Sequence, residues 1–196
     1  MSCSKEIQIV PSLGCSLEIL DLLCESVDAV MDRNDPLYLS PEHLATLKSL
    51  EIRLHNADQR YTGVLDVDPH RSHVAELYRL SILIYLYRVA KGEPMDCAAV
   101  EELVQQSFAL LNDMEFCLRP WPLFVIALEA HTDDLRKTML TILEESLKNR
   151  PLGSMQLLNR MIRDAWVQQD LHPGEIDPLR LYNAVISHNR IPPSFT

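Results

Sequence analysis

Residues 119–136 read RPWPLFVIALEAHTDDLR, and this stretch decides the fold of the chain. Two prolines flank a tryptophan at its start, and a run of apolar residues follows. The residue before Pro120 avoids helical geometry, so an earlier helix ends there. Pro122 fits the first turn of a new helix, because its missing N–H leaves no hydrogen bond unmade at that position. We therefore expect a short, deeply buried helix that ends near His131.

The apolar run stops at a polar corner that carries the signals of another helix start. Thr132 is a good N-cap residue, and Asp133 and Asp134 follow where the helix dipole favours anions. From there apolar residues recur every three or four positions as far as Asn149. The stretch thus predicts a buried helix, a bend and a newly capped helix.

Similar signals divide the rest of the chain into helices, because prolines, glycines and capping residues separate segments with helical apolar spacing. Alternation of β-branched residues over four or more positions occurs only at residues 6–10, so we expect no substantial strand. The predicted fold class is all-α: one compact bundle of about eight helices over residues 1–196, with loose ends at 1–12 and 189–196. The expected helices start near Ser16, Ser40, His73, Asp96, Pro122, Thr132, Met155 and Asp177.

The predicted helix at residues 73–91 is apolar nearly all round through its middle. A helix without a polar face must lie inside a bundle, covered by the other helices. Arg79 and Arg88 interrupt this segment, and Gly92 marks its end. Because an unpaired buried charge is costly, we expect both arginines to reach the rim or to pair with carboxylates.

Composition and charge exclude several classes of protein. Of the 196 residues, 47% are hydrophobic and 23% are charged, which is ordinary for a globular chain and unlike a disordered one. The formal net charge of −10 opposes binding to a nucleic-acid backbone or an anionic membrane surface. The apolar runs at residues 80–87 and 121–128 fall far short of the roughly 20 residues that a membrane span needs. We expect neither direct nucleic-acid binding nor a membrane partner.

Metal and disulfide chemistry is not indicated. The five cysteines are odd in number and form no CxxC pair, so we expect buried, reduced thiols in an intracellular protein. His70 and His73 have a spacing that metal ligands use, but the surrounding proline-broken loop implies no third ligand and favours a solvated polar loop. We expect no cofactor or metal in this chain.

Two groups of residues are candidates for a site. Glu129 and His131 are the visible candidates for acid–base chemistry, although pairing of Glu129 with Arg119 or Arg136 explains the carboxylate equally well. No GxSxG, glycine-rich phosphate loop or HExxH motif is present. The second group consists of inward-facing residues that either pack the core or line a pocket for an apolar ligand. They are Tyr78, Ile82, Tyr85, Trp121, Phe124, Met139, Met161 and Trp166.

The order of these segments resembles the fungal-specific transcription factor domain, the helical regulatory region of many Zn(II)2Cys6 regulators. In that family a Trp-Pro-Leu-Phe segment leads into Glu-Ala, a polar corner, an Arg and a further apolar helix, as in WPLFVIALEAHTDDLRKTMLTIL at 121–143. YRLSILIYLYR at 78–88 resembles an earlier central helix of the family, and weaker similarities extend the resemblance over roughly residues 13–172. The residues that match one by one are Trp121, Pro122, Leu123, Phe124, Glu129, Ala130 and Arg136.

The chain departs from the family pattern in two places. The family's DNA-binding element is a binuclear zinc cluster of six closely spaced cysteines, and these cysteines are absent here. The chain is then either the regulatory part of a longer factor or a protein that has lost its DNA-binding module, and zinc belongs only to that module. A small pair, often Gly-Cys, tends to precede Glu-Ala in the family, whereas Ala127-Leu128 stands here. The bulkier side chain is expected to change local packing or a cavity.

The resemblance implies a non-enzymatic regulatory or effector domain of a fungal transcription factor, located in the nucleus or in both nucleus and cytoplasm. It implies a small apolar ligand, and self-association or contact with a co-regulator protein. Two alternatives stay open. One is a helical interaction scaffold that binds no ligand, and the other is a small α-helical enzyme on an apolar substrate, with Glu129 and His131 at the mouth of its cavity.

Overall fold

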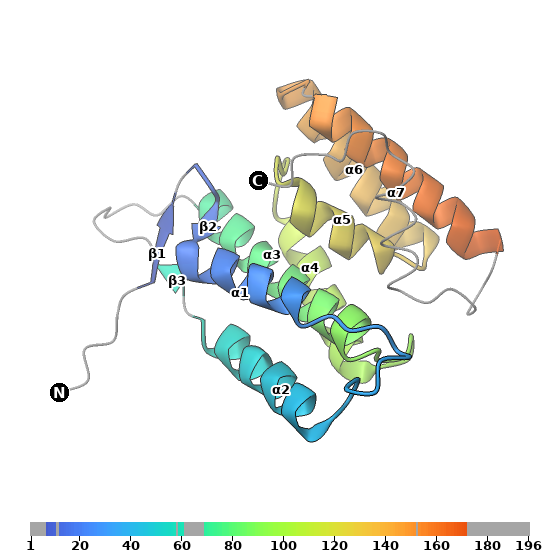
Figure 1. Ribbon diagram of the computed structural model, residues 1–196. Coiled ribbons are helices and arrows are strands. Elements are labelled where there is room, and N and C mark those ends of the chain that lie inside the picture. The colour runs from blue at the N-terminus through green and yellow to red at the C-terminus, as the bar shows by residue number, and fades with distance from the viewer. Residues whose placement is uncertain (1–6, 11, 58, 61–68, 152, 172–196) are drawn as a thin grey trace.

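Helix α3 (Pro69–Tyr85) lies at the centre of the computed structural model, with the other helices arranged around it (Figure 1). The structure describes residues 7–10, 12–57, 59–60, 69–151 and 153–171. Within these residues α3 contacts α1, α2, α4 and α5. Every residue from Leu80 to Ala90 is buried, which confirms that this apolar segment lies inside the bundle.

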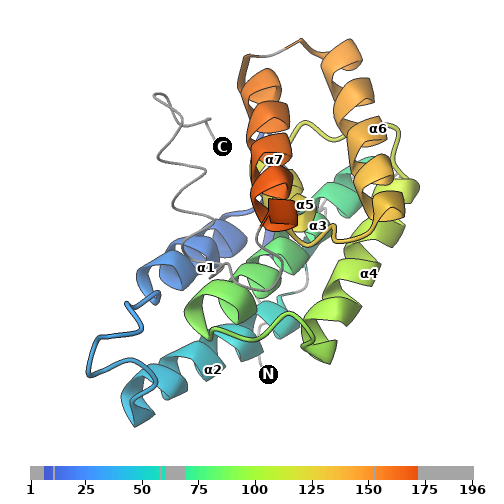
Figure 2. The same cartoon turned by 90° about the vertical axis from the view of Figure 1, so that its right-hand side faces the viewer.

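The described residues form seven α-helices and one π-helical turn, which confirms the all-α class. Helices α1 and α2 lie on one side of α3, and α5, α6 and α7 lie on the other (Figure 2). The eighth helix predicted from Asp177 and the predicted loose end at 189–196 lie outside the described residues. Besides α3, the elements are α1 (Leu17–Asp28), α2 (Pro41–Asn56), the π-helical turn η1 (Leu86–Ala90), α4 (Ala98–Asn112), α5 (Pro120–Leu128), α6 (Asp133–Asn149) and α7 (Gly153–Leu171).

A small sheet ties the N-terminal segment to the middle of the chain, where we had expected a loose lead-in. β1 (Ile7–Val10) lies between β2 (Cys15–Ser16), with which it pairs antiparallel, and β3 (Gln59–Arg60), with which it pairs parallel. The Gln59 side chain links β3 to β2 and to α3 through hydrogen bonds to two backbone groups. β1 lies within residues 6–10, the stretch where β-branched residues alternate, whereas strands of two residues such as β2 and β3 cannot show an alternating pattern.

Three predicted helix starts are confirmed by their caps. The hydroxyls of Ser16, Ser40 and Thr132 each accept a hydrogen bond from the backbone N–H three residues further on. The prediction for α4 was wrong by one residue, since its N-cap is Cys97 and not Asp96. A turn closed by the Cys97 N–H and the Pro94 carbonyl moves the first helical residue beyond the aspartate.

Helix α1 ends at Asp28, well before the proline at position 36. The aspartates after it take part in local turns instead of helix. Asp32 accepts a hydrogen bond from the Asn34 N–H, and Asp35 accepts one from the Leu37 N–H. Aspartate side chains that bond the backbone two residues on stabilise turns, and they compete with continued helix here.

Helix α5 is buried along its entire length, from Pro120 to Leu128. It packs against α3 on one side and α7 on the other. This confirms the predicted buried apolar helix, although it begins at Pro120 and not at Pro122 and ends at Leu128, before His131. The preceding helix α4 ends at Asn112, so Pro120 starts α5 and does not stop α4. The corner that follows leads directly to the cap at Thr132. No helix in the described part of the chain has both the length and the apolar character needed to cross a membrane.

Replacement of Thr132 by Ala should lower the free energy of unfolding by about 1 kcal/mol, because α6 loses the side chain that accepts the Leu135 N–H. Urea denaturation followed by circular dichroism measures this. Thr141→Ala is the matched control: Thr141 lies on the same helix and bonds only the Lys137 carbonyl, so its removal should be neutral or slightly stabilising. Equal losses for both variants would contradict the capping role.

Candidate functional site

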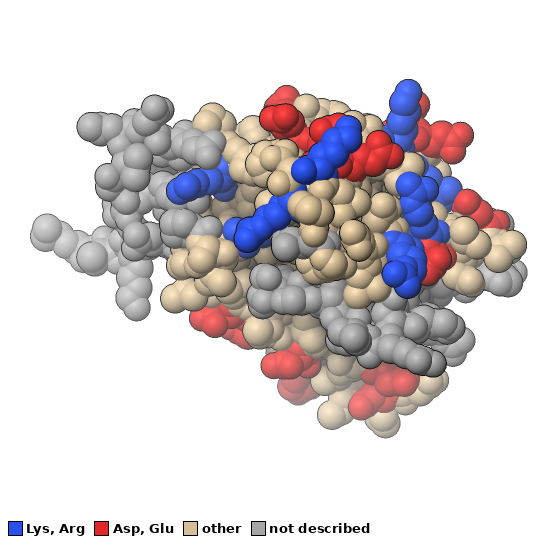
Figure 3. Space-filling view, turned by 90° about the horizontal axis from the view of Figure 1, so that it is seen from above, with Lys and Arg blue, Asp and Glu red and all other residues tan. Residues whose placement is uncertain are grey.

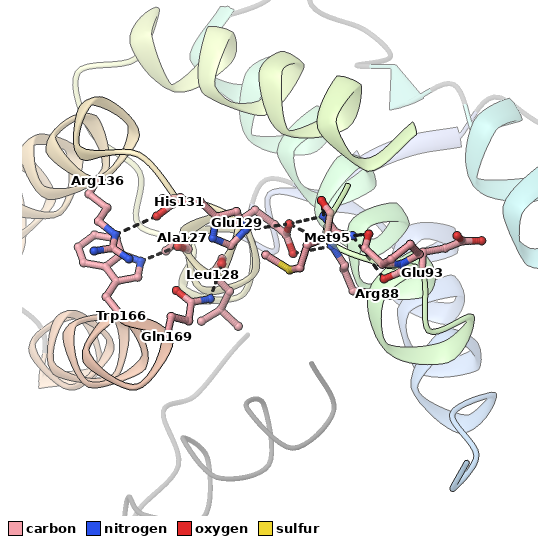
Figure 4. A network of polar contacts seen from close by, with 12 residues as sticks. Arg88, Glu93, Met95, Ala127, Leu128, Glu129, His131, Arg136, Trp166 and Gln169 are labelled. Atoms are coloured by element: carbon pink, nitrogen blue, oxygen red, sulfur yellow. Dashed lines mark hydrogen bonds and ion pairs between the residues drawn. The ribbon is translucent and has the colours of Figure 1, made fainter. Parts of the chain in front are cut away.

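A buried ion pair joins the centre of the bundle to the corner between α5 and α6 (Figure 4). Arg88, in η1, donates from Nε to both carboxylate oxygens of Glu129 at 3.1 Å and from Nη2 to Oε2 at 2.8 Å. The two residues are only 2% and 6% exposed. The expectation that Arg88 pairs with a carboxylate is confirmed, whereas the suggested partners of Glu129 were wrong. Sequence spacing gives no hint of the actual pair, because 41 residues separate its members.

The same guanidinium holds the loop that follows η1. Arg88 donates to the backbone carbonyls of Glu93, Pro94 and Met95, so that every side of its planar head has a partner. The π-helical turn places Arg88 for this task, with the Lys91 N–H bonded to the Leu86 carbonyl five residues back. Single π-helical turns of this kind occur often at functional sites. One side chain therefore fixes three segments: η1, the loop before α4, and the α5–α6 corner.

The end of α5 is held from its other side by α7. Trp166 Nε1 donates to the Ala127 carbonyl at 2.7 Å, and Gln169 donates to the Leu128 carbonyl at 2.8 Å. These carbonyls belong to the last turn of α5, where helix geometry leaves carbonyls without the N–H four residues further on; the Ala127 carbonyl also accepts the Ala130 N–H at 3.1 Å. Thus α7 satisfies the backbone at the point where α5 stops.

Arg136 closes this arrangement from α6. Its Nε donates to the Ala130 carbonyl at 2.9 Å, and its two terminal nitrogens bind the carboxylate of Asp170 at 2.8 and 2.7 Å. The guanidinium also lies 5.3 Å from the centre of the Trp166 ring. An arginine in this position bridges the corner and α7. Sequence reasoning proposed Arg136 as a partner of Glu129, and the structure gives it to Asp170 instead.

The electrostatics of Glu129 fit a carboxylate that is ionised near neutral pH. Burial raises the pKa of Glu129, but hydrogen bonds from His131 and Arg88 outweigh it and hold the pKa below its ordinary value. His131 Nε2 lies 3.6 Å from Glu129 Oε2, and both oxygens already accept bonds from Arg88. A group that stays charged and fully bonded is poorly suited to donate or take up protons near neutral pH.

The inward-facing residues proposed as pocket or core are all buried and belong to one apolar cluster. Tyr85 and Trp121 meet edge to face, with ring centres 5.3 Å apart. None of the eight lines the three surface pockets formed by described residues, which have volumes of about 240, 380 and 540 Å³. The eight are Tyr78, Ile82, Tyr85, Trp121, Phe124, Met139, Met161 and Trp166.

Two minor expectations need correction. His70 and His73 do not lie in a loop, because α3 begins at Pro69 and includes both. His70 packs on Phe116 with ring centres 4.8 Å apart, and no group of three or more potential ligands for a metal is found among the described residues. Cys15 and Cys117 are buried, and burial raises their thiol pKa to about 12 and about 11, but Cys24 is exposed on α1.

On the face seen in Figure 3, the described Lys and Arg residues lie in the upper part with Asp and Glu beside them, and the lower edge shows Asp and Glu alone. A surface that tracks a phosphate backbone needs a continuous row of cations. The face therefore offers no support for nucleic-acid binding, and the expectation that this chain does not bind nucleic acid stays a prediction.

The family described as the fungal-specific transcription factor domain matches residues 1–188. The chain belongs to this family. The match covers the α5–α6 corner, the central helix α3 and the α7 helix that bonds the end of α5. The resemblance stated from Trp121–Arg136 and residues 78–88 is thereby confirmed.

A curated relative supports the same conclusion. Transcription factor iacI of Pestalotiopsis fici is 28% identical to the chain over 96 residues. The matched part is 49% of this chain and 25% of the relative, so the chain spans a small part of that protein's length. No solved structure is significantly similar to the chain. Both comparisons therefore support a regulatory domain of the fungal transcription factor type.

Loss of either member of the buried ion pair should destabilise this fungal-specific transcription factor domain strongly. Arg88→Met removes the hydrogen bonds to a buried carboxylate and to three loop carbonyls, of which the Pro94 carbonyl keeps the Cys97 N–H, and we expect a loss of about 3 to 5 kcal/mol. Chemical denaturation measures the loss. Arg79→Met is the control in α3, the helix that leads into η1: Arg79 pairs with the half-exposed Glu76, so its loss should cost about 1 kcal/mol or less.

The pH dependence of stability should carry the signature of Glu129. Its folded-state pKa lies below the unfolded value, so its contribution is complete above the ordinary carboxyl range and is lost as pH falls through the folded-state value. The free energy of unfolding should fall on acidification below about pH 4.3. Glu129→Gln should flatten this dependence, while Glu145→Gln, on the surface of α6, should leave it unchanged. Parallel curves for wild type and Glu129→Gln would contradict the assignment.

Proposed function

We propose that the chain is a regulatory unit that senses a small apolar ligand through its α3–α5–α7 core and passes the response to a partner protein in the nucleus. The observation that carries this proposal is that α5 is held in place by elements on both of its sides. It is buried throughout, bonded to α7 through its last carbonyls, and bonded to η1 through Glu129 and Arg88. A packing change around α5 therefore reaches the outer helices on both sides.

The chemistry of the core supports an apolar ligand. Aromatic and methionine side chains from α3, α5, α6 and α7 converge there, and thioethers adapt to ligands of different shape. Opening such a core requires a ligand with higher affinity for the expanded packing than for the closed one. The buried ion pair is well suited to keep the two packings distinct, because its geometry tolerates little drift.

An enzymatic function is less well supported. Both oxygens of Glu129 accept hydrogen bonds from Arg88, and its pKa is held low, so this carboxylate is poorly suited to the acid–base role considered for it beside His131. The two buried thiols have raised pKa values, which opposes their use as nucleophiles. We therefore propose a non-enzymatic role.

A ligand-free interaction module is the second candidate, and one observation favours it. The pocket of about 540 Å³ between α1 and α2 is the largest of the three formed by described residues, and it is a surface groove away from the α5 core. Contact with a co-regulator or a second copy of the chain needs such a surface. The two candidates differ in whether the core accepts a ligand.

Native mass spectrometry of the purified chain with an apolar extract of fungal cells tests ligand sensing. We expect a discrete bound mass that raises the thermal midpoint and disappears when the chain is unfolded in urea, because binding to the folded state alone stabilises it. A reporter assay with the chain fused to an unrelated DNA-binding domain should respond to the same extract. Repeated absence of any bound mass, with an unchanged midpoint, would leave the interaction module as the better proposal.

A further inference from the structure

We propose that the groove between the end of α1 and the start of α2 docks an amphipathic helix of a partner protein, with apolar anchor residues flanked by Lys or Arg. The groove has a volume of about 540 Å³, and most of its exposed lining is apolar. Leu50 forms part of its floor, Met31 is half-buried in its wall, and Leu37 is 60% exposed at its edge. The surface offers anchor sites for apolar side chains.

The rim of the groove carries negative charges that no Lys or Arg of the lining offsets. Glu25, Asp28 and Glu42 line it, and no Lys or Arg is among the lining residues. Arg53 already binds Glu25 with both of its terminal nitrogens, whereas Asp28 and Glu42 have no ion-pair partner within the described residues. Two free carboxylates beside an apolar floor match a cationic side chain next to an apolar anchor.

The charge of Asp28 is also unfavourable for the stability of its own helix. It is the last residue of α1, and the last turn of that helix holds no basic residue. The helix dipole favours cations at this end, so an aspartate there costs some stability. A residue that opposes the stability of its own helix is expected where function requires its charge.

Two hydrogen bonds of the buried His43 side chain hold the two sides of the groove together. His43 is buried, its Nδ1 accepts the Leu39 N–H at 3.1 Å, and its Nε2 donates to the Ala29 carbonyl at 2.9 Å. This links the end of α1 to the start of α2. Leu39 is held at φ 57°, a left-handed conformation that a branched residue rarely adopts. Strain of this kind persists where the surroundings enforce it and is common at binding sites.

A partner helix fits these features better than other occupants. The groove is open to solvent, whereas small-molecule sites enclose most of their ligand. Its carboxylates repel an anionic membrane surface. A second copy of this chain, which carries a net charge of −10, would approach against that charge. A helix set beside α1 and α2 follows the general mode in which an amphipathic helix lies in an apolar groove.

This inference rests on the proposed role in partner contact, but its test reads binding alone and needs no reporter or ligand. A displayed library of amphipathic helices, with a fixed leucine face and randomised flanking positions, is selected against the purified chain. We expect enrichment of Lys and Arg beside the leucines. The affinity of a selected peptide is then measured by fluorescence anisotropy at about 0.15 M salt.

Charge-reversal variants inside and outside the groove are compared for their affinity for the selected peptide. Asp28→Lys should weaken the selected peptide about tenfold or more, and leave the thermal midpoint equal or higher because it suits the helix dipole. Asp21→Lys changes the net charge equally but lies on α1 outside the groove lining, and should change affinity by about twofold or less.

The proposal would be overturned by the absence of any enriched helix, by equal weakening in both variants, or by selection without a preference for Lys and Arg. A dimer of the chain alone in sedimentation velocity, lost in Asp28→Lys, would assign the groove to a second copy and also overturn it. None of these results depends on ligand sensing, so the regulatory proposal for the core can fail or stand separately.

Discussion

The buried pair of Arg88 and Glu129 is the constraint on which the rest of the structure depends. Two opposite charges in an apolar interior are tolerated only when each has its full set of partners. Arg88 meets this demand through the carboxylate and three carbonyls, and Glu129 meets it at the α5–α6 corner. The positions of η1, the loop before α4 and the corner are therefore not independent. The loop and the corner must each place their acceptor oxygens within hydrogen-bond distance of the Arg88 guanidinium.

Around this pair the helices are secured by backbone contacts as much as by packing. Trp166 and Gln169 reach from α7 to the final carbonyls of α5, and Arg136 reaches from α6 to the Ala130 carbonyl. Such bonds need an exact position of the receiving helix end, unlike apolar contacts, which tolerate small shifts. This arrangement gives the α5–α6 corner of this fungal-specific transcription factor domain one geometry.

Much of the fold could be predicted from the sequence, because its signals are local. Serine and threonine caps, prolines at helix starts and apolar spacing are read over a few residues, and the caps at Ser16, Ser40 and Thr132 are found as expected. The start of α4 shows the limit of that approach, since a turn at Pro94 displaced the cap from Asp96 to Cys97. The short sheet was missed although β1 lies in the stretch with β-branched alternation, because its partners β2 and β3 are strands of two residues and hold no period.

The polar network could not be predicted, because its members are far apart in the chain. That Arg88 seeks a carboxylate follows from burial, but the choice of Glu129 depends on how α3 and α5 cross. The two carbonyls that α7 binds have a further consequence for sequence change. Trp166 and Gln169 recognise main-chain oxygens of Ala127 and Leu128, which every amino acid supplies. Substitution at these two positions can thus alter the filling of the interior while the attachment of α7 persists, so the departure from the usual Gly-Cys pair is compatible with the same architecture.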